Sequence, residues 1–245
     1  MSVGIITAMV LVLLLTIAVP LGGMLFLHRR GGTWKSFLVG VGTFVLFALV
    51  LEPILHSLIL GSGIGAVIQG NIWLYGLYGG LMAGLFEETG RFLAFRYVLR
   101  NVPGRITSLS CGIGHGGIEA FILVGLTMIA NLSLGLAYTG GAELSAEMAA
   151  MAETLVSTPA GMFLWAGFER LTAMALHVSL SVLVCAAVRT GKRWMFPAAI
   201  LLHAAVDFVA VVSGAHFPVA VTEVLVLLVT ALAAVWAVRV YRKLS

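Results

Sequence analysis

The stretch VGIITAMVLVLLLTIAVPLGGMLFL, residues 3–27, decides the fold class because it contains no charged side chain. A helix rises 1.5 Å per residue, so this stretch is long enough to cross about 30 Å of hydrocarbon. A secretory signal peptide has a shorter apolar region that follows basic residues, and no basic residue precedes this stretch. Residues 3–27 therefore predict a true membrane-spanning helix.

The rest of the chain has the same apolar character. Of its 245 residues, 61% are hydrophobic and 10% are charged, and the mean hydropathy is +1.11. Soluble domains carry about 25% charged residues. A soluble core of this size cannot bury so much apolar surface, so the surrounding solvent must be lipid. The composition also excludes disordered, collagen-like and disulfide-stapled proteins. Cys111 and Cys185 form no redox or zinc motif, and we expect both to be small packing residues.

Six further apolar stretches follow the first. The predicted spans cover residues 3–27, 36–60, 72–99, 108–137, 160–188, 195–213 and 218–238. The segment 138–158, which is rich in Ala and Glu, predicts an exterior loop or a short interfacial helix. We therefore expect an all-α polytopic membrane protein with about seven transmembrane helices. Residues 1–245 form one domain in this prediction, and the spans within 72–213 form its functional core.

The basic residues outside the spans predict the orientation. In a seven-span arrangement twelve of the 14 Lys and Arg residues fall on one side, and the opposite loops contain none. By the positive-inside rule, the N-terminus lies outside and the C-terminus in the cytoplasm. These residues are scattered over short loops, which argues against nucleic-acid binding. They are Arg29, Arg30, Lys35, Arg96, Arg100, Arg105, Arg189, Lys192, Arg193, Arg239, Arg242 and Lys243.

The ionisable residues inside the spans are the functional signal. Each such group costs about 2.5–3.5 kcal/mol on insertion scales, so the bundle must gain pairing or chemistry from them. Seven of them, on four predicted helices, lie roughly 10–18 Å below the cytoplasmic surface; these are Glu87, Glu88, His115, Glu119, His177, His203 and Asp207. The remaining ones are Glu52, His56, Arg91, Glu169 and Arg170.

Helical spacing places several of these groups on shared faces. The shared faces join Glu87 and Glu88 to Arg91, His115 to Glu119, and His203 to Asp207. Four glycines surround His115 in the stretch 111–117 and would let a neighbouring helix or an extended substrate come close. Glu52 with His56, and Glu169 with Arg170, are expected to be structural pairs. A purely structural ion cluster is the alternative reading of the Glu87, Glu88 and Arg91 group.

The same residue types favour hydrolysis. That reaction needs an activated water, a general base and a group that stabilises an oxyanion. Glu87 or Glu88 can supply the base, the histidines can bind a metal or donate hydrogen bonds, and Asp207 can orient His203. Other membrane enzymes fit less well, because all three lysines lie outside the spans, Asp207 is the only aspartate and HExxH is absent. A retinal protein, an aspartyl protease and an HExxH metalloprotease are thereby excluded.

Four motifs, in this order, resemble a known family: Glu87-Glu88-Thr89-Gly90-Arg91, Gly114-His115-Gly116-Gly117-Ile118-Glu119-Ala120, His177-x-x-x-Ser181 and His203-x-x-x-Asp207. They resemble the YhfC family of bacterial membrane proteins, which are regarded as intramembrane metalloproteases. That family is distantly similar to the CAAX-protease/bacteriocin-processing and PrsW families of glutamate-dependent intramembrane proteases. The match covers spans three to six and implies a location in the bacterial cytoplasmic membrane.

The resemblance implies a role for each motif residue. One of the paired glutamates activates water, and His115, His177, His203 and Asp207 match the later motifs; with Arg91 and Glu119 they make up the predicted catalytic set. His115, His177 and His203 are the provisional ligands if a metal such as Zn²⁺ is bound, and a metal-free mechanism is the alternative. The CAAX-type first motif usually reads EExxxR and its second has Phe where this chain has Cys111. These departures fit the YhfC family better and do not imply a CAAX substrate.

The sequence thus predicts an intramembrane peptidase that opens towards the cytoplasm and cleaves a membrane-associated protein or peptide. Its partners are that substrate and membrane lipid. Two alternatives stay open. The same Glu, His and Asp groups would serve a proton- or ion-coupled transporter as a relay. A non-catalytic membrane partner or immunity-type protein would keep the fold without turnover.

Overall fold

The computed structural model describes residues 1–244, which fold into helices and contain no β-strand. The helices are α1 (Val3–His28), α2 (Trp34–Thr43), α3 (Glu52–Leu60), α4 (Gly63–Gln69), α5 (Ile72–Leu93), α6 (Ile106–Ala120), α7 (Leu126–Thr139), α8 (Ala146–Ser157), α9 (Ala160–Thr190), α10 (Met195–His216) and α11 (Val219–Tyr241). Three π-helical segments, η1 (Phe44–Leu51), η2 (Ala94–Val98) and η3 (Phe121–Gly125), join or extend them. The all-α prediction is confirmed.

Local sequence signals explain where several helices begin and end. The side chains of Ser2, Thr33, Asn71 and Ser145 accept hydrogen bonds from the first-turn N–H groups of α1, α2, α5 and α8. Helix α9 stops at Gly191, whose φ of 71° is the left-handed conformation that glycine adopts without strain. Each cap satisfies backbone groups that the helix itself leaves unpaired.

All seven predicted spans are helical. Six continuous helices are long and apolar enough to cross a membrane, namely Val3–His28, Trp34–Leu60, Ile106–Thr139, Ala160–Thr190, Met195–His216 and Val219–Tyr241. The remaining one, α5 with η2, carries Glu87, Glu88 and Arg91 in its second half and is less apolar for that reason. The prediction of a seventh crossing therefore depends on whether these charges are paired inside the bundle.

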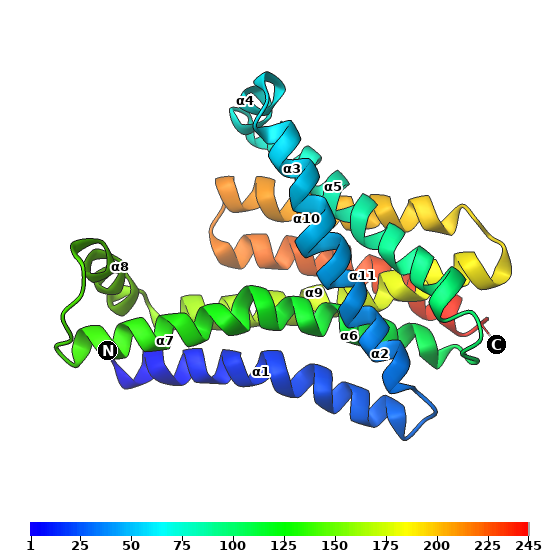
Figure 1. Cartoon of the computed structure of the whole chain (residues 1–245), viewed down its shortest axis with the longest axis horizontal. Helices are drawn as coiled ribbons and strands as arrows, with labels where there is room; N and C mark the ends of the chain where they lie inside the picture. Colours follow the sequence, from blue (N-terminus) through cyan, green and yellow to red (C-terminus); the bar gives the residue numbers. More distant parts are fainter. Residues whose placement is uncertain (245) are drawn as a thin grey trace.

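The basic loops gather at one end of the molecule. The α1–α2, η2–α6 and α9–α10 connections and the C-terminus all lie at the right of Figure 1. Two arginines link the last three of these segments. Arg189 donates to the carbonyls of Val102 at 2.6 Å and Gly104 at 2.9 Å, and Arg105 donates to Tyr241 O at 3.4 Å. We call this the basic end. Helix α8, which the sequence predicted as a loop or short interfacial helix over 138–158, and helix α4 lie away from it (Figure 1).

Glycines bring the helices that carry the polar residues into backbone contact. A Cβ on Gly114 of α6 would lie 2.1 Å from Phe37 O of α2, and a Cβ on Gly84 of α5 would lie 2.6 Å from Ile200 O of α10. No larger side chain fits at such separations, so these pairs of helices pack closer than branched residues allow. The close approach sets α2 against α6 and α5 against α10 at the level of the polar residues.

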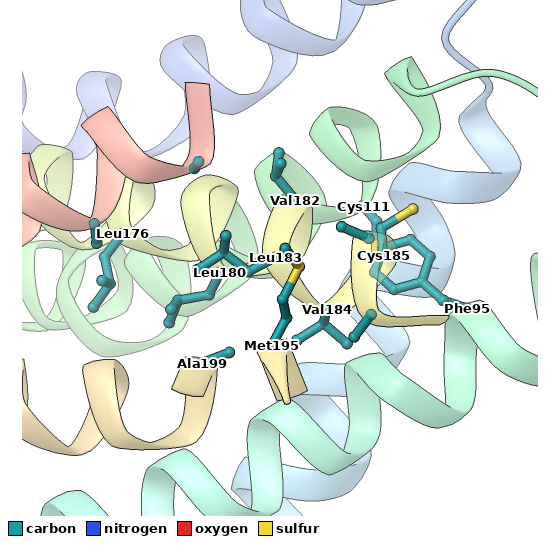
Figure 2. Close-up of a cluster of buried hydrophobic side chains, with 14 of the residues drawn as sticks. Phe95, Cys111, Leu176, Leu180, Val182, Leu183, Val184, Cys185, Met195 and Ala199 are labelled. Carbon is teal, nitrogen blue, oxygen red and sulfur yellow. The ribbon is translucent and has the colours of Figure 1, made fainter. Parts of the chain in front are cut away.

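A hydrophobic cluster fills the space between the polar residues and the basic end. Figure 2 shows it: α9 contributes Leu180, Val184 and Cys185, and η2, α6 and α10 contribute Phe95, Cys111, Met195 and Ala199. The residues Cys111 and Ala199, from α6 and α10, precede His115 and His203 by four residues, on the side towards the basic end. Both cysteines are buried free thiols in this cluster, which fits their predicted role as packing residues.

Candidate active site

Polar side chains from four helices meet in one buried cluster inside the bundle. Helix α5 supplies two glutamates and an arginine, α6 a histidine and a glutamate, α9 an arginine and a histidine, and α10 a histidine with an aspartate at the margin. Glu88, Arg91 and His115 are fully buried. The structure thus brings together every residue of the predicted catalytic set: Glu87, Glu88, Arg91, His115, Glu119, His177, His203 and Asp207.

The centre of the cluster contains two carboxylates and two imidazoles. One potential ligand atom from each of Glu87, His115, Glu119 and His177 lies within 4.8 Å of the other three. His115 Nε2 is 2.7 Å from Glu87 Oε2, and His177 Nε2 contacts Glu119 Oε2. These atoms come from three different helices, so the packing of α5, α6 and α9 defines the arrangement.

Arg91 is the cation that permits two adjacent buried glutamates. Its guanidinium donates to Glu88 Oε1 and, at 3.4 Å, to Glu87 Oε2. It also donates to His177 Nδ1 at 2.6 Å. An unpaired charge in a low-dielectric interior is strongly unfavourable, whereas a paired and hydrogen-bonded one is tolerated. The i,i+3 and i,i+4 pairing predicted from spacing is therefore present, and Arg91 additionally links α5 to α9.

His203 connects this centre to the edge of the cluster. Its Nδ1 lies 2.8 Å from Glu88 Oε1, and its Nε2 lies 3.5 Å from Asp207 Oδ2. The His177 and His203 rings are 5.4 Å apart between centroids. His203 is thus held chiefly by Glu88, while Asp207, whose side chain is 34% exposed, forms the margin of the site.

Arg170 contributes to the site, which the sequence did not predict. The sequence suggested a structural pair with Glu169, and Arg170 does donate to Glu169 Oε1 at 2.5 Å. Its second donor contacts Glu119 Oε1 at 2.7 Å. Glu119 therefore lies between Arg170 on one side and His177 on the other. The sequence did show that Arg170 is a charge inside a span, but its spacing along one helix could not indicate a partner on another helix.

Helix α2 and the start of η1 supply two residues with no signal in the sequence. Thr43 Oγ1 is 3.0 Å from His115 Nδ1, and the Phe44 ring packs edge-on against the His115 ring at 5.3 Å. A threonine and a phenylalanine in an apolar span are ordinary residues. Thr43 is the last residue of α2, directly before η1, and π-helical segments are frequent at functional sites.

The glycines around His115 have a packing role. A Cβ on Gly112 would lie 2.6 Å from Val178 Cα of α9, and a Cβ on Gly117 would lie 2.4 Å from Pro20 of α1. With Gly114 against α2, they let three helices approach α6 around His115. The sequence left open whether the glycines admit a helix or a substrate backbone, and the described residues place helices there.

Glu52 and His56 form a separate pair on the far side of Asp207. His56 Nε2 is 2.9 Å from Glu52 Oε1, and His56 Nδ1 is 2.8 Å from Tyr78 Oη. This agrees with the expectation that the two residues satisfy each other. A cavity of about 400 Å³ lies between α3, α5 and α10 and is lined by His56, Tyr78, Gly79 and Asp207 among others. Its lining residues belong to α3, the first half of α5 and the second half of α10, on the side of the polar cluster away from the basic end.

Comparison with known proteins gives the family of the chain. A family model described as YhfC intramembrane metalloprotease matches residues 15–229. The chain belongs to this family. A curated relative, the uncharacterized membrane protein YhfC of Bacillus subtilis (strain 168), is 33% identical over 236 residues, and the alignment covers 91% of each chain. No solved structure matches the chain. Membership and the apolar spans establish an integral membrane protein, in agreement with a bacterial cytoplasmic membrane.

The family description implies a metal, and the central residues are chemically suited to hold one. Imidazole nitrogens and carboxylate oxygens are the common ligands of catalytic zinc, at about 2.0–2.2 Å. Glu87, His115, Glu119 and His177 supply two of each, all buried and mutually close. The sequence named His115, His177 and His203 as provisional ligands. In the structure, His203 lies beside this group and two glutamates complete it.

Proposed function

We propose that this YhfC-family chain is a peptidase that cleaves membrane-associated proteins or peptides within the bilayer, with a zinc ion held by His115, Glu119 and His177 and with Glu87 as general base. One observation carries the proposal: four buried ligand-type groups converge within 4.8 Å in the interior of an apolar bundle. When bound, zinc polarises a carbonyl and turns water into a nucleophile near neutral pH.

The choice of three ligands follows from coordination chemistry. Catalytic zinc sites usually have three protein ligands and keep one position open, and two histidines with one glutamate are a known set. Four protein ligands would close the site. Glu87 is the carboxylate best placed to act as the base, because its Oε2 lies 2.7 Å from His115 Nε2 and 3.8 Å from His177 Nδ1.

The two histidines differ in their readiness as ligands. Arg91 donates to His177 Nδ1, so a neutral His177 carries its proton on Nε2, towards Glu119. Metal binding at His177 therefore has to release that proton or exchange the Arg91 contact. His115 has its Nδ1 at Thr43 and is the better prepared of the two.

Residues of this chain can carry the proton transfers of peptide hydrolysis. Glu87 takes a proton from water, the water oxygen bonds to the carbonyl carbon of the scissile peptide, and the C–N bond then breaks as Glu87 returns the proton to the amine. His203 can donate a hydrogen bond to the oxyanion from Nε2 when its ring is doubly protonated, with the Nδ1 proton donated to Glu88 and the Asp207 carboxylate beside Nε2. Glu88 acts by holding His203 and Arg91 in place.

The cavity beside Asp207 supports a route for the substrate. It is the point where the polar cluster reaches a space large enough for side chains, about 400 Å³. Towards the basic end, the side chains of the hydrophobic cluster of Figure 2 fill the space between the helices. We therefore propose that substrate enters by this cavity, on the side of the polar residues away from the basic end, whereas the sequence predicted an opening towards the cytoplasm.

The test compares Glu87→Gln with Glu119→Gln in purified protein, using zinc content and cleavage of a quenched fluorescent peptide library in detergent. We expect Glu87→Gln to keep zinc and lose cleavage, and Glu119→Gln to lose both. Glu52→Gln is the matched control for zinc content, because Glu52 is also a buried glutamate paired with a histidine but lies outside the central group. Chelator-insensitive cleavage, or full cleavage by Glu87→Gln, would refute the proposal. Zinc binding without any cleavage would favour the non-catalytic alternative.

A further inference from the structure

The hydroxyl of Thr43 has two neighbours. Its Oγ1 lies 2.7 Å from the backbone carbonyl of Gly40 and 3.0 Å from His115 Nδ1. A hydroxyl has one proton, and a carbonyl oxygen only accepts, so that proton is donated to Gly40. Thr43 must then accept from His115, and the proton of a neutral His115 is on Nδ1.

This assignment determines what the other nitrogen of His115 can do. With the proton on Nδ1, Nε2 presents a lone pair, and it faces Glu87 Oε2 at 2.7 Å. Two acceptors at this distance repel each other unless a proton or a metal ion lies between them. Metal-ligating histidines usually donate their second N–H to a carboxylate, a carbonyl or water, which fixes the ring and its tautomer. Thr43 makes a contact of the same type.

We propose that Thr43 is a positioning residue of the metal centre, which orients His115 and keeps its proton on Nδ1 so that Nε2 is available to the metal. This rests on the proposed function. Phe44, the next residue, packs edge-on against the same ring and restricts its rotation. Gly40 and Gly114 supply the backbone approach that brings Thr43 within reach, since a Cβ on Gly40 would lie 2.0 Å from Cys111 O.

The chain offers a matched set of variants. Thr43→Val removes the hydroxyl and keeps the shape of the side chain, whereas Thr43→Ser keeps the hydroxyl and removes only the methyl group. Thr16→Val is the control, because Thr16 is buried like Thr43 and its Oγ1 donates to the carbonyl of Leu13, three residues earlier, at 2.8 Å. In the structure, Thr43 likewise donates to a carbonyl three residues earlier, so Thr16→Val removes the helix contact without removing a histidine contact.

The first measurement is the affinity of each purified protein for Zn²⁺ and Co²⁺ in competition with a chromophoric chelator. We expect Thr43→Val to bind each ion about 10–100-fold more weakly, which is the usual effect of losing such a partner. Thr43→Ser and Thr16→Val should keep the affinity of the parent protein. Unchanged affinity in Thr43→Val, or failure of Thr43→Ser to restore it, would overturn the proposal.

The second measurement needs neither metal nor substrate. Nitrogen-15 NMR of histidine-labelled, metal-free protein distinguishes a protonated from an unprotonated Nδ1, and the His115→Asn variant identifies the His115 signal. We expect His115 to carry its proton on Nδ1, and Thr43→Val to lose that preference while Thr16→Val keeps it. An unprotonated Nδ1 in the parent protein would overturn the role of Thr43. If the parent binds no metal yet shows this tautomer, the metalloprotease proposal fails and the Thr43 contact stands.

Discussion

Gly114→Ala is the most direct test of how the fold positions the site. The added Cβ would lie 2.1 Å from Phe37 O, 2.8 Å from Phe37 C and 3.0 Å from Phe37 Cα. All three are backbone atoms, so no side chain can rotate away, and α2 must retreat from α6 by about 1 Å before the contact reaches normal separation. Overpacking of this kind costs about 1–3 kcal/mol, partly offset by the better helix propensity of alanine, which is worth up to about 1 kcal/mol.

The displacement acts on the site through Thr43. The Thr43 to His115 contact is 3.0 Å, and a retreat of about 1 Å takes it beyond hydrogen-bonding distance. We therefore expect zinc affinity to fall about 10–100-fold, as for loss of a partner that orients a ligand. Gly42→Ala is the control, because Gly42 precedes Thr43 in α2 and a Cβ added there would meet no neighbouring heavy atom of the described residues within 4 Å.

Stability can be followed through the chain's own cysteines. Cys111 and Cys185 are buried free thiols, so a maleimide dye that fluoresces on reaction reports their exposure on heating. A change of 1 kcal/mol shifts the melting temperature of a soluble protein of this size by about 2–4 °C, and we expect Gly114→Ala to melt a few degrees lower than Gly42→Ala. Equal melting temperatures and equal zinc affinities would show that the α2–α6 backbone contact does not position His115.

Three further predictions concern the cavity, the buried ion pairs and the orientation in the membrane. Gly79→Trp should fill the cavity beside Asp207 and lower peptide cleavage at least about tenfold while zinc affinity stays unchanged; full cleavage would exclude this cavity as the substrate route. Arg91→Leu removes the partner of two buried carboxylates and should destabilise the protein by about 3–5 kcal/mol, and a melting temperature within about 2 °C of the parent, on the scale of about 2–4 °C per kcal/mol, would contradict that pairing. A green fluorescent protein fused after residue 245 should fluoresce, and alkaline phosphatase fused in the 138–158 segment should be active; the opposite pattern would reverse the orientation.

Much of the fold could be predicted because the relevant signals are local. Each span is a run of apolar residues, and all the predicted pairs except Glu169 with Arg170 are side chains three or four residues apart on one helix. Glu87 with Arg91 is such a pair, and the structure contains it. The glycines around His115 are also a local signal, since four of them in one turn and a half predict close helix packing whatever the partner is.

The rest depends on how helices rotate and tilt against each other, which spacing along one chain does not determine. Thr43 meets His115 across 72 residues, and Arg170 meets Glu119 across 51. Both contacts require a particular rotation of α2 or α9 about its axis. The predicted ligand set included His203 instead of Glu119 for the same reason. The two residues lie at similar predicted depths, and only the packing of the helices places Glu119 beside His177.

The chain of contacts between polar side chains distinguishes the transporter alternative from the peptidase. A relay needs groups that continue from one side of the membrane to the other. Here the contacts run from the centre through Glu88 and His203 to Asp207 and the cavity, with Glu52 and His56 beyond it. In the other direction they stop at the hydrophobic cluster of Figure 2, where Leu180, Leu183 and Val184 are fully buried.

A path open on one side is what a hydrolase needs, since substrate and water enter and products leave by the same cavity. We therefore expect no proton flux into proteoliposomes under an imposed potential beyond that of empty liposomes, measured with an internal pH dye. Asp207→Asn should leave this baseline unchanged while it lowers peptide cleavage. A flux in the parent protein that Asp207→Asn abolishes would mean that the hydrophobic cluster opens in another conformation, and that Asp207 carries protons across the membrane instead of serving a site of hydrolysis.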